Sequence, residues 1–108
     1  MKIYVAGPLS SPTTVGYLRN MARMVSVAVE LWRMGHAPYI PALDFLFAIV
    51  ASVKEVPLTL EDLYELNYPW LEACDAVFMI APSPGTDLEV ARARKLGIPV
   101  YTTFEEIP

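Results

Sequence analysis

The sequence contains one cysteine, Cys74, and one histidine, His36, in 108 residues. A single cysteine excludes an intrachain disulfide and any Cys-x-x-Cys metal or redox motif. A single histidine excludes His-rich zinc sites and argues against a Ser-His-Asp triad. These counts predict no metal site built from cysteine or histidine, and we also expect no cofactor.

Basic residues are also scarce, with eight Lys and Arg against twelve Asp and Glu and a formal net charge of −4. No run is rich in Lys or Arg, which argues against a nucleic-acid polymer as partner. A small anionic metabolite remains possible, because backbone amides can bind an anion without basic side chains.

Long apolar runs are missing as well. The most apolar segment, FLFAIVASV at 45–53, is too short to span a bilayer. The N-terminal residues MKIYVAG lack the charged region and long apolar stretch of a signal peptide. We expect a soluble, cytoplasmic protein that does not enter a membrane.

Apolar residues make up 55% of the chain, which is enough for a buried core in one domain over residues 1–108. Strand-like apolar runs occur at 2–6, 37–40, 75–81 and 98–102. Helical patterns lie between them, at about 15–34, 42–53, 59–73 and from Gly85-Thr86 to Gly97. This order predicts a doubly wound α/β fold of the Rossmann-like or flavodoxin-like type. Its sheet is mostly parallel, with four to five strands and helices on both faces.

Local signals refine these elements. In the helix at 15–34, apolar residues recur at helical spacing at Leu18, Ala22, Val25, Val29 and Trp32. Gly35 and Gly97 are placed to end their helices as C′ residues. Pro69 is expected to kink or restart its helix. Residues 104–108 are expected to form a tail.

The helix at 42–53 is apolar nearly all round. Such a helix requires burial, and a domain of this length has little interior to provide it. An exposed apolar patch larger than roughly a few hundred Å² usually marks a partner surface, and symmetric dimers most often cover one. We predict a homodimer or larger homo-oligomer with residues 45–53 in the interface.

Polar and glycine residues follow each strand, where open α/β sheets bind ligands. The segments are GPLSS at 7–11, PALD at 41–44, PSPGTDLE at 82–89 and TTFEE at 102–106. The first is a glycine-containing turn before a helix, which can bind phosphate through amides and hydroxyls. It matches neither the GxGxxG fingerprint nor a Walker loop.

Glu89 has two interpretations. Thr86 and Glu89 fit the S/T-x-x-E capping box, in which both side chains bind backbone amides at a helix start. Alternatively, Glu89 is a carboxylate at the carboxyl end of a strand, kept ionised there by the helix N-terminus and facing a ligand.

Three segments resemble the nucleoside 2-deoxyribosyltransferase superfamily, in the order found there: IYVAGPLS at 3–10, NYPWLEACDAVFMI at 67–80 and SPGTDLEVARARKLGIPVY at 83–101. The most specific element is S-x-G-x-x-x-E, formed by Ser83, Gly85 and Glu89. The resemblance covers about residues 2–102. Among the superfamily's small members are 2′-deoxynucleoside 5′-phosphate N-hydrolases, which this chain resembles.

The resemblance implies cleavage of the N-glycosidic bond of a 2′-deoxynucleoside 5′-monophosphate, by hydrolysis or by deoxyribosyl transfer. Glu89 is then the nucleophile that attacks C1′ and forms a glycosyl-enzyme ester. Tyr4 matches a tyrosine that orients the nucleophile. Ser83 matches the serine that binds the 5′-phosphate in the nucleotide hydrolases, whereas the transferases tend to carry aspartate.

Asn67 stands where the superfamily carries an acidic residue, and it completes the implied catalytic set with Glu89 and Tyr4. An amide can hydrogen-bond a base or sugar but cannot donate a proton to a leaving base. Asp62, Asp44 and Asp87 are alternative acids. The residues expected to contact the substrate and its phosphate are Gly7, Pro8, Ser10, Ser83, Gly85, Thr86 and Asp44.

Two other classes of function remain open. Asn67 also fits a nucleotide-binding module that is catalytically weak or inactive. The apolar helix at 42–53 fits a structural domain that serves only assembly. The enzyme and the binding module share a small-molecule nucleotide as the expected ligand.

Overall fold

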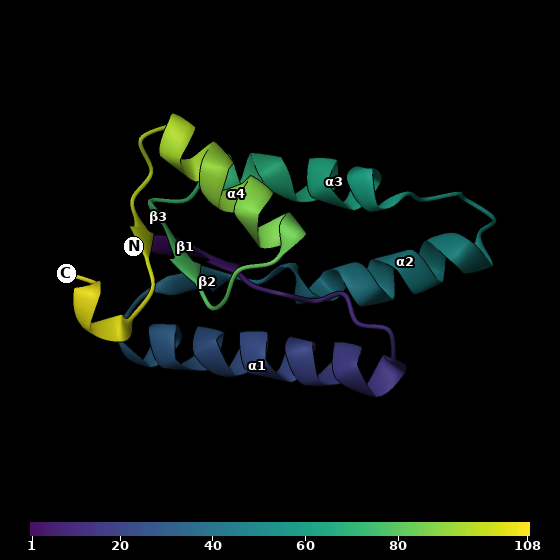
Figure 1. Ribbon diagram of the computed structural model, residues 1–108, viewed down its shortest axis with the longest axis horizontal. Helices are drawn as coiled ribbons and strands as arrows, with labels where there is room; N and C mark the ends of the chain where they lie inside the picture. Colours follow the sequence, from purple (N-terminus) through teal and green to yellow (C-terminus); the bar gives the residue numbers. More distant parts are fainter.

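The computed structural model describes the backbone of residues 1–108 and every side chain except that of Ala42. Four parallel strands form the sheet, in the order β2-β1-β3-β4. They are β1 (Lys2–Ala6), β2 (Ala37–Tyr39), β3 (Ala76–Met79) and β4 (Val100–Tyr101). The helices are α1 (Thr14–Arg33), α2 (Asp44–Val53), α3 (Leu60–Glu72) and α4 (Pro84–Lys95), with 3-10 turns η1 (Pro41–Leu43) and η2 (Phe104–Glu106). The doubly wound α/β prediction is confirmed: α1 lies on one side of the sheet, with α3 and α4 on the other (Figure 1).

The central strand β1 supplies both halves of the core. Ile3 and Val5 pack into a cluster with α1, whereas Tyr4 and Ala6 pack on the opposite side with α3 and α4. All four residues have no exposed surface, as expected when helices cover both faces of a parallel sheet. This alternation directs Tyr4 towards α4, the helix that carries Glu89.

The apolar stripe recognised in α1 does not face the sheet. The residues of α1 that pack into the core are Met21, Met24, Val27, Ala28 and Leu31. Leu18, Val25, Val29 and Trp32, which we call the α1 surface, are 41–68% exposed. The apolar arc of α1 is wider than one stripe, so the spacing identified a helix without identifying its buried side.

Two helix ends follow the glycine signals closely. Gly35 and Gly97 have φ angles of 92° and 74° and follow the C-caps of α1 and α4. After each glycine, a backbone amide bonds back into the last turn, His36 to Leu31 O and Ile98 to Ala93 O. These bonds define Schellman motifs and confirm both predictions.

The predicted start of α3 at residue 59 is confirmed, and the helix does not restart at Pro69. Thr59 Oγ1 accepts from the Asp62 amide at 3.1 Å, and Asp62 Oδ2 accepts from the Thr59 amide at 2.8 Å, which completes a capping box. Pro69, however, lies inside a helix that continues to Glu72. Because Pro69 and Glu65 are exposed, solvent can solvate the carbonyl group that proline leaves without a donor.

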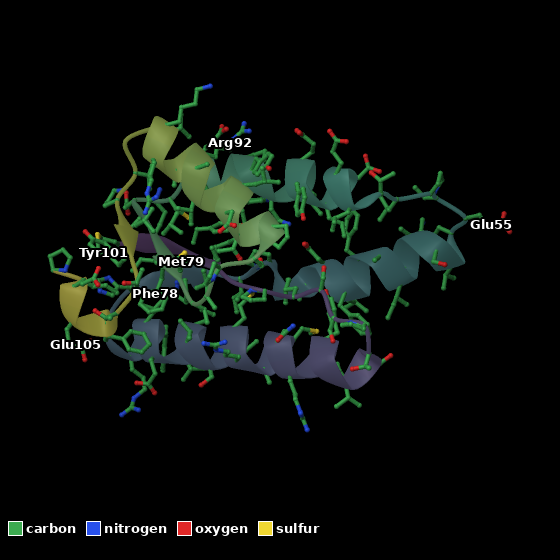
Figure 2. The ribbon with its side chains drawn as sticks, viewed as in Figure 1. Glu55, Phe78, Met79, Arg92, Tyr101 and Glu105 are labelled. Carbon is green, nitrogen blue, oxygen red and sulfur yellow. The ribbon has the colours of Figure 1, made fainter. Side chains whose placement is uncertain are left out.

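The expected tail at 104–108 belongs to the core. Phe104 stacks on Phe78 of β3 with ring centroids 4.9 Å apart, and Ile107 is only 8% exposed. Figure 2 shows Phe78 on the side of the sheet where the C-terminal segment folds back. Two apolar residues are therefore enough to fold a segment whose composition resembles a loop.

Helix α2 stays largely uncovered. It extends away from the sheet (Figure 1), and Glu55, with a φ angle of 58°, lies at the tip of the loop that follows (Figure 2). Ala51 is its one buried residue among the described side chains. The exposed apolar residues in and beside it, which we call the α2 surface, are Leu43, Leu46, Phe47, Ile49, Val50, Val53, Val56 and Leu60. None of the helices described here combines the length and apolarity needed to cross a membrane.

Candidate functional site

A pocket of about 310 Å³ opens where β1 and β3 end and α4 begins. From β1 the chain continues to β2 on one side of β1, and it later returns to β3 on the other side of β1. The crossover connections therefore diverge between β1 and β3. Open α/β sheets bind ligands at such a switch point. The volume lies at the lower end of the roughly 300–1,000 Å³ found for small-molecule pockets.

The structure brings all ten predicted site residues to this one pocket. They are Tyr4, Gly7, Pro8, Ser10, Asp44, Asn67, Ser83, Gly85, Thr86 and Glu89. The other two candidate acids, Asp62 and Asp87, are exposed and are not among the lining residues. Asp62 is occupied instead in the capping box of α3.

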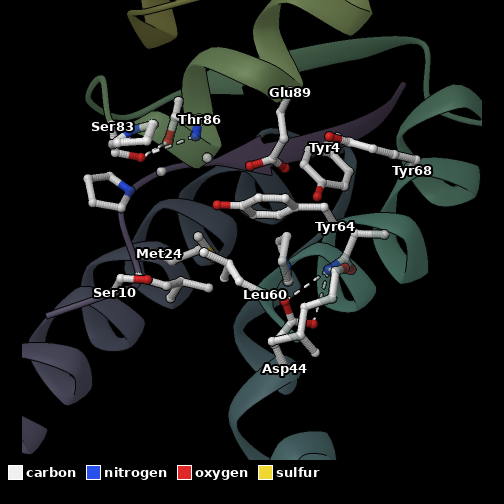
Figure 3. Close-up of a pocket in the computed structure, with 18 of the residues that line it drawn as sticks. Tyr4, Ser10, Met24, Asp44, Leu60, Tyr64, Tyr68, Ser83, Thr86 and Glu89 are labelled. Atoms are coloured by element: carbon white, nitrogen blue, oxygen red, sulfur yellow. Dashed lines mark hydrogen bonds between the residues drawn. The ribbon is translucent and has the colours of Figure 1, made fainter. Parts of the chain in front are cut away.

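Glu89 points into the pocket from the second turn of α4 (Figure 3). The capping-box interpretation of Thr86 and Glu89 is wrong, because the N-cap of α4 is Ser83, whose Oγ accepts from the Thr86 amide at 3.1 Å. Among the described side chains, Glu89 Oε2 is buried without a hydrogen-bond partner. Such an atom is costly to bury, and it is available to a ligand.

Burial raises the pKa of Glu89 to about 7. The nearby Tyr4 hydroxyl lowers this pKa and the charge of Asp44 raises it further, but both effects are smaller than desolvation. This rise opposes the expected effect of the helix N-terminus, because desolvation is the largest influence on the pKa of Glu89.

Tyr4 lies beside Glu89 (Figure 3) and has no exposed surface. Its pKa is raised, first by burial and then by the negative charge of Glu89, so its hydroxyl keeps its proton. The hydroxyl makes no hydrogen bond of good geometry with the described residues. Its ring stacks on Tyr39 at 5.5 Å, and Tyr39 stacks on Trp70 at 5.6 Å. This stack fixes the ring and leaves the hydroxyl available as a donor.

Asn67, on the face of α3 towards the pocket, is 5% exposed. Its Nδ2 donates to Asp44 Oδ1 and Oδ2 at 3.1 and 2.9 Å and to Leu63 O at 2.9 Å. Its Oδ1 accepts from the Tyr39 hydroxyl at 3.0 Å. The amide therefore joins α3 to β2 and to the start of α2.

The first turn of α4 forms another wall of the pocket. Ser83 Oγ lies 2.8 Å from Thr86 Oγ1, and Thr86 is 1% exposed. A Cβ at Gly85 would lie 3.0 Å from the hydroxyl oxygen of Tyr64, so glycine permits Tyr64 to approach this turn closely. Backbone amides at a helix start, together with hydroxyls, can bind an anion.

Sequence reasoning missed the aromatic wall that α3 provides. Tyr64 and Tyr68 line the pocket beside Asn67, and their spacing places all three on one helix face. That spacing could have identified them. Arg92 stacks on the Tyr68 ring at 4.2 Å and bonds Glu72 at 2.6 and 2.9 Å. Figure 2 shows Arg92 on α4, beside α3.

No metal-ion site emerges from the described side chains, which hold no group of three or more His, Cys, Asp or Glu close enough to bind one. The acidic side chains lining the pocket are Glu89 and Asp44, on opposite sides in Figure 3. A carboxyl pair in an apolar, tyrosine-rich pocket can perform nucleophilic and acid-base chemistry on a small molecule.

The fold is nucleoside deoxyribosyltransferase-like. The solved structure of a 2-deoxyribosyltransferase from the psychrotolerant bacterium Bacillus psychrosaccharolyticus matches with a TM-score of 0.58, over 93% of this chain and 69% of that one. The two sequences are 21% identical, a level at which the likeness is one of fold. Residues 1–102 match the family described as a domain of unknown function, DUF4406, and the chain belongs to that family. A search of curated protein sequences finds no significant match.

Proposed function

We propose that the protein cleaves the N-glycosidic bond of a 2′-deoxynucleoside 5′-monophosphate, by hydrolysis or by deoxyribosyl transfer. The observation that carries the proposal is the buried, unpartnered Glu89 carboxyl group, which faces the pocket beside Tyr4. The fold shared with a 2-deoxyribosyltransferase supports the same chemistry.

In the first step, the Glu89 carboxylate attacks C1′ and forms an ester with the sugar. The bond between C1′ and the base breaks, and its electron pair goes to the base nitrogen. Tyr4 donates towards Glu89 and orients the carboxylate. Water or a second base then attacks C1′ and releases Glu89.

The 5′-phosphate is assigned to the first turn of α4. Ser83 and Thr86 present hydroxyls there, and Ser10 lines the same pocket from the loop after β1. The backbone amides of this turn favour a negative charge, which compensates for the lack of basic side chains in the pocket.

Incubation with each deoxynucleoside monophosphate, including modified pyrimidines, tests the proposal. We expect one or more free bases to be released without added metal or cofactor. If no substrate releases a base, the enzymatic proposal is wrong. An intact nucleotide that binds in a calorimetric titration would then support the binding module, which Asn67 favours because an amide cannot donate a proton to a leaving base.

Ser83→Ala separates phosphate binding from helix capping. We expect KM for the monophosphate to rise roughly 10- to 100-fold, while KM for the free nucleoside changes little, because only the former offers an anion. Loss of the N-cap should also cost about 1 kcal/mol of unfolding free energy.

The matched control is Thr59→Ala, which removes the N-cap of α3 outside the pocket. It should reduce stability by a similar amount and leave both KM values near those of the wild type. Equal effects of Ser83→Ala on nucleotide and nucleoside would contradict the assignment of the phosphate to Ser83.

A further inference from the structure

The Asn67 amide has no donor left for a substrate, because both Nδ2 hydrogens are used within the protein. Both of its Nδ2 hydrogens point to acceptors on Asp44 and Leu63, and its Oδ1 is occupied by Tyr39. Asn67 is 5% exposed, and it donates to both carboxyl oxygens of Asp44. The neighbour that lines the pocket with a titratable group is Asp44.

The carboxyl oxygens Oδ2 and Oδ1 of Asp44 lie 2.9 and 3.1 Å from Asn67 Nδ2. Carboxylates at both positions would repel each other at this distance. An amide at 67 removes that repulsion and donates to both oxygens of Asp44. The two side chains therefore form one unit, in which Asn67 orients the carboxyl group of Asp44 and Asp44 carries the proton.

We propose that Asp44, positioned by Asn67, is the general acid that protonates the leaving base, an inference that rests on the proposed function. As Glu89 attacks C1′ and the glycosidic electron pair moves to the base, the Asp44 carboxyl proton transfers to a base nitrogen or oxygen. In the second step, the Asp44 carboxylate accepts a proton from the attacking water or from the incoming base, while C1′ leaves Glu89. The acid is thus regenerated, and all protons are accounted for.

The environment of Asp44 suits this role. Desolvation raises its pKa, and the hydrogen bond from Asn67 offsets part of this rise. The titratable groups that sense its charge come from β1, α1, β2 and α4, namely Tyr4, Tyr17, Tyr39 and Glu89. Of these four groups, Glu89 is a carboxyl group and the other three are phenols. In the proposed mechanism Glu89 is ionised and Asp44 is protonated, so the active form of the pair carries one proton. This predicts a bell-shaped dependence of the rate on pH.

The test compares a substrate whose base needs a proton to leave with one whose base does not. For a purine enzyme the pair is dGMP and 7-methyl-dGMP, because the methylated base is cationic and departs as a neutral molecule. For a pyrimidine enzyme the pair is dUMP and its 5-nitro analogue, because nitrouracil departs as a stable anion. Each pair is assayed with wild type, Asp44→Asn, Asn67→Ala and the exchange variant Asp44→Asn/Asn67→Asp.

We expect Asp44→Asn to lower kcat on the parent nucleotide about 10²- to 10⁴-fold, the usual contribution of a general acid. On the activated substrate, its loss should be within about tenfold. The high-pH limb of the wild-type profile should vanish with the activated substrate. For Asn67→Ala, kcat should fall mainly on the parent nucleotide. The exchange variant should recover part of the activity that Asp44→Asn loses on the parent nucleotide, and its pH profile should again show the high-pH limb.

Equal losses of Asp44→Asn on both substrates would overturn the acid role. So would a high-pH limb that the wild type keeps with the activated substrate, a result that does not depend on whether any variant folds. If the wild type releases base from both substrates but Asp44→Asn matches it, the acid proposal fails and the proposed function stands. If the wild type releases base from neither, the proposed function fails, and this inference fails with it.

Discussion

Glu89→Gln is expected to lower turnover at least roughly a thousandfold and to leave the fold intact. The substitution keeps the size of the side chain and removes the charge that attacks C1′, so the covalent step loses its nucleophile. The rate of base release from the best deoxynucleotide measures the effect. Circular dichroism checks the fold. A variant with the wild-type rate would contradict the nucleophile role.

The same substitution should change how stability depends on pH. The pKa of Glu89 is raised from 4.5 to about 7 in the folded protein, so the folded state binds more protons than the unfolded state between these values. Glu89 should therefore contribute a decrease of up to about 3 kcal/mol in the unfolding free energy as pH rises from 4.5 to beyond 7. Glu89→Gln removes that decrease and should be the more stable protein at pH 8.

Chemical denaturation at pH 4.5 and pH 8 measures this difference. Glu65→Gln is the matched control, because Glu65 is exposed on α3 and the substitution is chemically identical. Its pH dependence should follow the wild type. If the curves of Glu89→Gln and wild type stay parallel, burial does not perturb Glu89 in the way described. A gain in stability at pH 8 would indicate that Glu89 is kept for chemistry and not for folding.

Disruption of the α2 surface is expected to convert a homodimer into monomers. Phe47 and Val50 are each 48% exposed, and Phe47→Glu with Val50→Lys would place two charges in an apolar contact. Removing such charges from water at an interface costs several kcal/mol, so dimer dissociation should increase at least roughly 100-fold. Light scattering over the micromolar range measures it, with circular dichroism to show that the variant is folded.

The α1 surface provides the matched control. Val29→Glu introduces a charge at a residue that is 47% exposed, on a separate apolar face. It should leave the dimer intact if α2 forms the interface. Dissociation by Val29→Glu and not by the α2 variant would contradict the α2 assignment. A wild type that is monomeric at micromolar concentration would show that neither surface forms a dimer.

Local patterns in the sequence were enough to predict the order of the elements and the edge of the sheet that carries the pocket. Apolar runs predicted the strands, glycine predicted the ends of α1 and α4, and a parallel sheet brings the carboxyl ends of its strands together. Residues as distant as Ser10 and Glu89 could therefore be assigned to one site, whereas Tyr4 was assigned to it by the family resemblance. These inferences succeed because they depend on local backbone preferences and on a topology with few alternatives.

The use of individual side chains depended on how the elements pack together. Periodicity defines the apolar arc of α1, but the side that is buried depends on what packs against it. The role of Glu89 depended on which residue caps α4. Because the N-cap is Ser83 and not Thr86, Glu89 lies in the second turn of the helix and faces the pocket. The contact between Asn67 and Asp44 joins residues 23 positions apart, and no spacing rule predicts it. Such contacts arise when separate elements pack together, because packing creates the burial and the hydrogen bonds that set each group's chemistry.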